Sequence, residues 1–205
     1  MSATPAAAGA VLDDWFGPLA SADRFNRDRL ERWFGNGRAY DDAIRARFGA
    51  LHAQAAAGAL DEAWPATPAG RLALVVVLDQ FSRHIHRGSA AAFANDAHAQ
   101  RLTLVGLARG DDRQLLPIQR LFFYLPLEHA EDRTLQAVSV AAFERLRDEA
   151  PAALAAEFDG FLDYARRHQA VIERFGRFPE LNALLGRDSR AEELAFLGDP
   201  EHSFL

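Results

Sequence analysis

Two amino acids are missing from this 205-residue sequence: it has no cysteine, and all 23 of its basic residues are arginine, so it has no lysine. Without lysine there is no Schiff-base nucleophile, no pyridoxal attachment point and no P-loop lysine. Without cysteine there is no thiol catalysis, no disulfide, no iron–sulfur cluster and no cysteine-based zinc site. These two absences exclude several large classes of enzyme.

Long apolar runs and excess positive charge are also absent. The longest uninterrupted apolar run, 72–78, has seven residues, whereas a bilayer-spanning helix needs ~20. Acidic residues outnumber basic ones by 29 to 23, which disfavours a nucleic acid as partner. The first ten residues have no basic leader followed by a long apolar core, so they do not predict a secretory signal. We expect a cytoplasmic chain that binds neither nucleic acid nor membrane and needs no cofactor; a homodimer stays open.

Alanine is abundant, with 41 residues, and leucine, arginine and glutamate supply much of the rest. These are strong helix formers, so the composition predicts an all-α fold. We expect one domain over residues 1–205, with 1–9 as a flexible N-terminal tail. Caps, breakers and apolar spacing predict about nine helices, at roughly 11–16, 22–34, 40–57, 68–82, 89–108, 117–126, 131–150, 151–175 and 189–197. Thr67 and the pair Ser189 with Glu192 are the expected caps of two of them.

The first candidate site lies at the end of the apolar run 72–78. Asp79 follows that run on a helix predicted to be buried all round, where a carboxylate needs a partner. Arg83, one turn later, falls on the same face, and Gln80 is adjacent. A structural ion pair and a pocket role are both consistent with this spacing.

The second candidate follows the proline at position 126. His129 and Asp132 would share a face if this turn is helical, and Glu131 lies between them. Breaks in helices often form ligand sites. The alternative for the two acids is that they only favour the positive N-terminal end of the next helix.

Two further candidates lie near the C-terminus. His168 falls on an apolar stripe, which is typical of a hydrogen-bonded core histidine, although its imidazole would be the best general base if it faces a cavity. Arg174 and Arg177 flank the end of a helix and are followed by Asn182. Arginine there either complements the helix dipole or binds a carboxylate or phosphate.

Several of these strings together resemble an uncharacterised bacterial family, catalogued as domain of unknown function 924, over nearly the whole chain. The matching strings lie at 12–17, 70–74, 78–83, 125–132, 165–168, 172–179 and 182–187. The resemblance implies a tetratricopeptide-like, right-handed helical array and no known reaction. Glu180 and Leu181 stand where similar proteins tend to carry His and Arg. If those positions are reactive in relatives, this chain lacks part of their site.

Our leading hypothesis is a polar concave pocket that binds a small anionic or zwitterionic molecule. Its expected lining is Asp79, Gln80, Arg83, His129, Glu131, Asp132, His168, Arg174, Arg177 and Asn182. The sequence names no catalytic residue securely.

One alternative is a hydrolase with His129 or His168 as base and Asp79 or Asp132 to orient it. Its metal-assisted version would use His129, Asp132 and His168 as ligands. A second alternative is a scaffold that binds a peptide or protein in its groove.

Overall fold

The computed structural model describes residues 3–19, 21, 27–35 and 38–199. Over these residues the chain consists of helices and connecting turns without a strand, which confirms the all-α fold. The α-helices are α1 (Ala6–Phe16), α2 (Leu30–Phe34), α3 (Arg38–Ala56), α4 (Pro68–Val76), α5 (Ser82–Ile85), α6 (Asp96–Arg109), α7 (Pro117–Glu128), α8 (Arg133–Glu149), α9 (Ala155–Phe175) and α10 (Ala191–Leu197). Short 3₁₀ turns lie at Arg27–Arg29, Trp64–Ala66, Ala90–Phe93, Asp111–Gln114, Ala152–Leu154 and Pro179–Leu181.

The segment Pro68–Ile85 is helical throughout, with a π-helical turn at Val77–Phe81 between α4 and α5. Its first turn is capped as expected, because the Thr67 side chain accepts a hydrogen bond from Gly70 N at 3.0 Å. Every residue from Gly70 to Ser82 is buried. The three adjacent valines are therefore part of a core helix rather than a strand.

A second buried helix, α7, lies against this segment and against α6, α8 and α9. It continues through Pro126 to Glu128, two residues beyond the break expected at the proline. A proline this close to a helix end removes one backbone hydrogen bond, and the final turn is kept by His129 N, which donates to Leu125 O at 2.9 Å.

The N-terminal prediction needs a correction. Helix α1 begins at Ala6, inside the expected tail, and Ala8 and Val11 are fully buried. The side of α1 that carries them packs on α4, so burial of apolar surface orders the chain from residue 6 onward. The expected helix at 22–34 lies partly outside the described residues; its described part is a 3₁₀ turn followed by α2.

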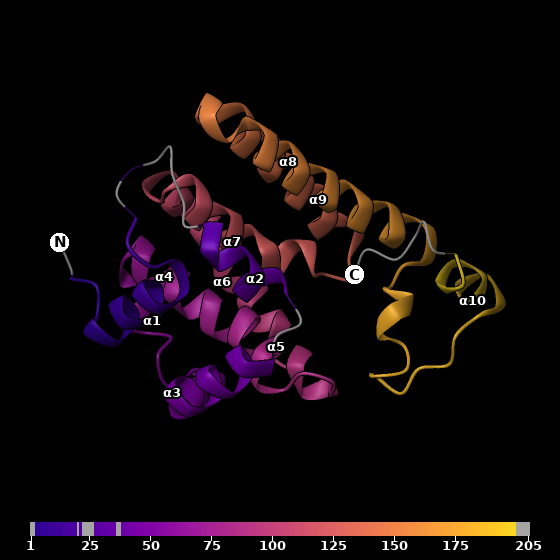
Figure 1. Ribbon diagram of the computed structural model, residues 1–205, viewed down its shortest axis with the longest axis horizontal. Coiled ribbons are helices and arrows are strands. Elements are labelled where there is room, and N and C mark those ends of the chain that lie inside the picture. The colour runs from indigo at the N-terminus through magenta and orange to yellow at the C-terminus, as the bar shows by residue number, and fades with distance from the viewer. Residues whose placement is uncertain (1–2, 20, 22–26, 36–37, 200–205) are drawn as a thin grey trace.

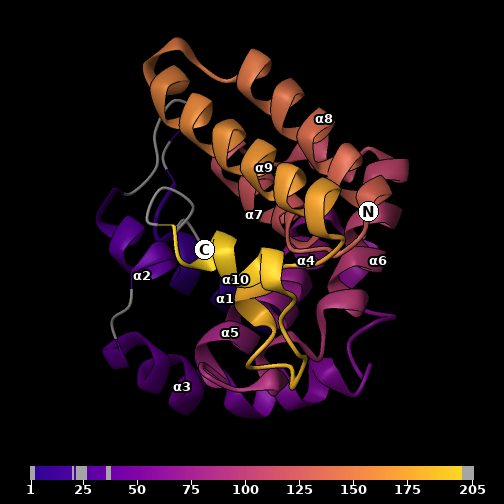
Figure 2. The same cartoon turned by 90° about the vertical axis from the view of Figure 1, so that its right-hand side faces the viewer.

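Helices α8 and α9 form a long antiparallel pair that covers α7, at the opposite end of the molecule from α3 (Figures 1 and 2). Helix α10 lies beyond the end of α9, where a small second core gathers around Phe175 and Phe196. Its capping residue is Arg190, whose backbone N donates to Glu193 at 2.7 Å. The cap predicted at Ser189 and Glu192 was thus wrong by one residue. Within the described part of the chain, no helix has the length and apolarity that crossing a membrane requires.

Candidate functional site

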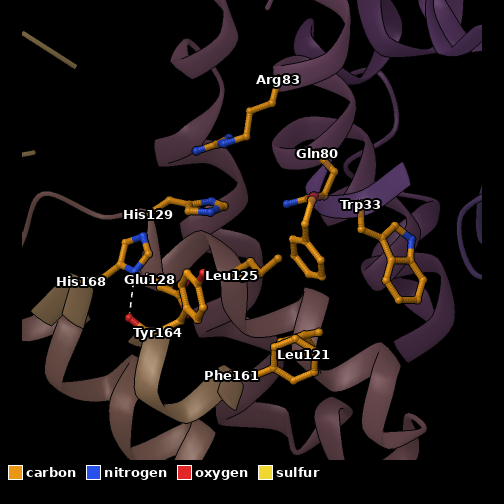
Figure 3. Close-up of a pocket in the computed structure, with 11 residues that line it drawn as sticks. Trp33, Gln80, Arg83, Leu121, Leu125, Glu128, His129, Phe161, Tyr164 and His168 are labelled. Carbon is orange, nitrogen blue, oxygen red and sulfur yellow. Dashed lines mark hydrogen bonds and ion pairs between the residues drawn. The ribbon is translucent and has the colours of Figure 1, made fainter. Parts of the chain in front are cut away.

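A cavity of about 400 Å³ opens between α2, the end of the α4–α5 segment, α7 and α9. Its walls differ in chemistry. Figure 3 shows the His129 and His168 rings and the Arg83 guanidinium on one side, and Trp33, Leu121 and Phe161 on the other. The complete lining is Trp33, Phe34, Gln80, Arg83, Leu121, Leu125, Glu128, His129, Phe161, Tyr164 and His168.

The π-helical turn places two polar residues at this cavity. A π turn accommodates one more residue than an α turn, and such turns occur frequently at functional sites. Gln80 lines the cavity, and Asp79 lies directly behind it with no exposed surface. Gln80 Nε2 donates to Asp79 Oδ2 at 2.6 Å, so the amide is held by the carboxylate.

Asp79 is the centre of the polar network. Its Oδ1 lies 2.8 Å from His129 Nδ1 and 3.0 Å from Arg83 Nη1. Burial alone would raise the pKa of Asp79, but the charge of Arg83 and the contacts with His129 and Gln80 outweigh it and lower that pKa to about 2. Asp79 is therefore an ionised carboxylate inside the protein, compensated by its neighbours.

The bond to Asp79 fixes the tautomer of His129. Because an ionised carboxylate only accepts hydrogen bonds, Nδ1 carries the proton, and the neutral ring has its lone pair on Nε2. The ring lines the cavity, and the side chain is 20% exposed. A carboxylate-oriented imidazole of this kind can accept a proton from a bound molecule.

Arg83 lines the cavity but is already engaged by acids. Its two terminal nitrogens bind the two carboxylate oxygens of Asp96 at 3.0 and 3.1 Å, in addition to the contact with Asp79. Burial lowers the pKa of Arg83, and the two carboxylates more than reverse that effect. One guanidinium thus faces two carboxylates, and little of its positive charge is left for a ligand.

Glu128 and His168 form the second polar group of the cavity. Burial, followed by the negative charge of Asp79, raises the pKa of Glu128 to about 8, and burial lowers the pKa of His168 to about 4. Glu128 Oε1 lies 3.4 Å from His168 Nδ1, which donates instead to Tyr164 O at 2.9 Å. At neutral pH this is a protonated acid beside a neutral imidazole rather than an ion pair.

The turn after α7, which carries Glu128 and His129, is held from α8. Gln136 is fully buried, and its Nε2 donates to Glu128 O at 2.6 Å and to Ala130 O at 2.8 Å. These carbonyls at the helix end have no partner within α7, so the side chain caps it. The cap fixes the direction in which both cavity residues project.

Six of the residues predicted from the sequence lie outside the lining: Asp79 lies directly behind it, and the other five lie elsewhere. Glu131 accepts hydrogen bonds from Phe178 N at 2.7 Å and from both terminal nitrogens of Arg187 at 2.5 and 2.8 Å. Asp132 is the N-cap of α8 and accepts from Leu135 N at 2.9 Å. Asp132 thus acts at the N-terminal end of the next helix, as the alternative interpretation stated, whereas Glu131 holds the segment after α9.

The other three hold the C-terminal segment. Arg177 binds both carboxylate oxygens of the buried Glu193 at 2.7 and 2.8 Å, and Asn182 donates to Glu193 Oε2 at 3.1 Å. The Arg174 guanidinium lies over the rings of Phe175 and Phe196. Structural contacts account for all three side chains.

The metal-assisted alternative does not match the geometry. Within the described ranges, no three histidine or acidic side chains come close enough together to hold a metal ion. Asp132, the carboxylate that this alternative needs, caps a helix instead. We therefore do not carry it further.

Sequence reasoning missed Glu128 and the apolar wall of the cavity. The signal for Glu128 was available, because it directly follows the apolar run 121–127, as Asp79 follows 72–78. The wall comes from α2, α7 and α9, and no local pattern indicates that Trp33 meets Phe161 at one cavity.

A family model described as a bacterial protein of unknown function (DUF924) matches residues 11–201. The chain belongs to this family. The DUF924 chain also resembles the solved structure of a protein of unknown function, ATU0120, from Agrobacterium tumefaciens. That similarity has a TM-score of 0.79 and 31% sequence identity and covers 94% of this chain and 97% of the other. No curated protein matches. Neither description names an activity, so the function has to be argued from the cavity.

Proposed function

We propose that this DUF924 protein binds a small amphipathic molecule in the cavity between α2, α5, α7 and α9. The observation that carries the proposal is the division of one cavity into two chemically different ends. Gln80, Glu128, His129 and His168 offer hydrogen bonds at one end, while the other is aromatic and aliphatic. A volume of about 400 Å³ lies in the range of small-molecule sites.

The charges at the polar end favour a zwitterion over a simple anion. Asp79 and Asp96 share the guanidinium of Arg83, so this end keeps about one negative charge when His129 is neutral. An isolated carboxylate or phosphate would meet that charge, and Arg83, the arginine of the lining, is already paired with Asp79 and Asp96. A ligand that brings a positive group with it avoids this repulsion.

Binding of matched aromatic probes tests the proposal. We expect calorimetry to detect at least one of 2-phenylethylamine, phenylalanine, 2-phenylethanol and 3-phenylpropionate. Leu125→Trp, which places a larger side chain in the lining, should weaken that binding at least about tenfold. Val105→Trp, on the exposed side of α6, is the matched control and should leave binding unchanged. Absence of binding by all four probes at millimolar concentration would contradict the proposal.

A second candidate function, hydrolysis, is favoured by the Asp79–His129 pair. His129 Nε2 can take a proton from a water molecule that attacks an ester, and the protonated Glu128 can donate one to the leaving oxygen. A positioned base of this kind contributes about 10²–10⁴-fold. We therefore expect His129→Gln to lower ester turnover at least about a hundredfold, with His86→Gln as the control. Equal turnover by the wild type and His129→Gln would remove this candidate.

A further inference from the structure

Among the described residues, Glu128 is a buried acid without a counter-ion. Its side chain is 6% exposed, and its carboxyl lines the cavity. In the part of the chain that the structure describes, the polar atom next to this carboxyl is His168 Nδ1, at 3.4 Å. That nitrogen donates its hydrogen bond to Tyr164 O instead. By contrast, the buried acids Asp41, Asp79 and Glu193 each contact an arginine. This difference needs an explanation, because burying an unpaired carboxyl is costly.

The surroundings of Glu128 favour a positive charge in the cavity. Glu128 is the last residue of α7, where the helix dipole is negative. The uncompensated carboxylate charge of Asp79 and Asp96 acts in the same direction. Four aromatic residues, Trp33, Phe34, Phe161 and Tyr164, also line the cavity, and the faces of such rings attract cations.

We propose that Glu128 is the counter-ion of a protonated amine carried by the ligand, with the aromatic wall around the rest of the molecule. The ligand class is then a small aromatic or aliphatic amine, or an amino acid-like zwitterion. This inference rests on the proposed function, since it concerns the same cavity. It adds that the polar group of the ligand is a protonated amine.

Pairing with an ammonium group changes the protonation of the Glu128 carboxyl. In the empty cavity Glu128 holds a proton at neutral pH, since its pKa is raised to about 8. An ammonium that arrives already charged pairs with the carboxylate form, so the carboxyl releases its proton to solvent while the amine keeps all of its own. The other charged and titratable groups at this end are Asp79, Asp96, Arg83, His129 and His168. Of these, His168 is neutral near pH 7, because burial lowers its pKa to about 4.

Calorimetry with three probes of similar size tests the inference. At pH 6.5, we expect 2-phenylethylamine to bind at least about tenfold more tightly than 2-phenylethanol, and 3-phenylpropionate to bind most weakly. Repeating the titration in buffers of different ionisation enthalpy should show release of about one proton per amine and none for the alcohol. This measurement needs no variant.

Glu128→Gln keeps the shape and hydrogen-bonding capacity of the protonated acid. It should remove both the preference for the amine and the release of the proton, while binding of the alcohol stays within about twofold. Glu173→Gln, an exposed acid on α9, is the matched control and should change neither.

The possible failures are distinguishable. If no probe binds, the proposed function itself fails. If the alcohol or the acid binds as tightly as the amine, or if the amine binds without release of a proton, the ligand cavity stands and the role of Glu128 is overturned. An unfolded Glu128→Gln variant would leave the probe comparison and the wild-type proton count to decide.

Discussion

Glu128 and His168 lie next to each other in the cavity, and their pKa values move in opposite directions from the ordinary ones. In the folded state Glu128 keeps its proton up to about pH 8, and His168 stays unprotonated down to about pH 4. Stability contributed through Glu128 is therefore lost as the pH rises from about 4.5 to about 8. Stability contributed through His168 is lost as the pH falls from about 6.5 to about 4.

Glu128→Gln should isolate the first of these effects. Since glutamine has no proton to lose, we expect its stability relative to the wild type to rise by about 1.4 kcal/mol per pH unit between pH 5 and 7.5 and to level off above pH 8. Urea denaturation at a series of pH values measures this difference. For Glu173→Gln the stability difference from the wild type should not change with pH. The same result for Glu128→Gln would show that Glu128 ionises normally.

The pH dependence of stability that Asp79 contributes has the opposite sign from that of Glu128. The pKa of Asp79 is lowered to about 2, so its contribution is complete above about pH 4 and is lost as the pH falls towards 2. Asp79→Asn leaves His129 without its carboxylate and Arg83 with Asp96 alone, and we expect a loss of about 3 kcal/mol at pH 7. Asp42→Asn, which removes an exposed i, i+3 pair with Arg45, should cost less than about 0.5 kcal/mol in the same denaturation experiment. Equal losses for the two variants would contradict the central role given to Asp79.

At the scale of single elements, two irregular helix segments build the polar end of the cavity. The π-helical turn presents Asp79 and Gln80, and the end of α7 presents Glu128 and His129. Both follow long runs of buried apolar residues, whose packing holds each polar residue at a fixed depth.

The cap on α7 offers a test at this scale. Gln136→Ala removes both hydrogen bonds to the helix end, and we expect a loss of about 2 kcal/mol in the free energy of unfolding. We also expect the NMR signals of the His129 ring to shift, because the turn that carries it is freed. Ser139→Ala is a matched control one turn along α8, since Ser139 Oγ is buried and has no hydrogen-bond partner among the described residues. Its stability should be unchanged or slightly higher, and a similar loss for both variants would reject the cap.

Most elements could be predicted from the sequence because their signals are local. Thr67 followed by proline marks the start of α4, and the length of the apolar pattern identifies the valine run as helical. The errors occur where tertiary packing overrides a local signal. Ala8 buries against α4 although its neighbours in sequence suggest a tail, and α7 passes Pro126 because it is enclosed by α4, α6, α8 and α9.

At the scale of the whole molecule, two acids hold the C-terminal segment, the buried Glu193 from within the segment and the exposed Glu131 from the start of α8. Glu193 binds Arg177 and Arg190, and Glu131 binds Arg187 and the backbone of Phe178. These contacts join α10 and the turn after α9 to the start of α8. The segment depends on them because its own apolar core is small.

Glu193→Gln should loosen this segment while the cavity stays intact. The amide is neutral and cannot accept at both positions, so the pairing with Arg177 and Arg190 is weakened. We expect limited proteolysis between residues 176 and 190 to become several-fold faster, and the binding of probes in the cavity to stay as in the wild type. Glu192→Gln, which alters an exposed neighbour, should be cut like the wild type. Unchanged proteolysis of Glu193→Gln would show that the small apolar core suffices.

The sequence alone could not assemble the candidate site. Asp79 was singled out correctly as a carboxylate that needs a partner, but its partner His129 is 50 positions away. Arg177 and Asn182 are residue types that are common in binding sites, but both bind Glu193 in the C-terminal segment. Residue type indicates which chemistry is available, and only the packing of helices decides which groups meet. The right-handed, tetratricopeptide-like course of the array stays a prediction.

The position of Trp33 in the cavity wall gives the molecule an optical reporter. The other two tryptophans, Trp15 and Trp64, are buried and lie outside the lining. Replacing both with phenylalanine would leave an indole whose emission changes when the cavity fills. Occupancy could then be followed by fluorescence, without a dye or a label, in the search for the natural ligand.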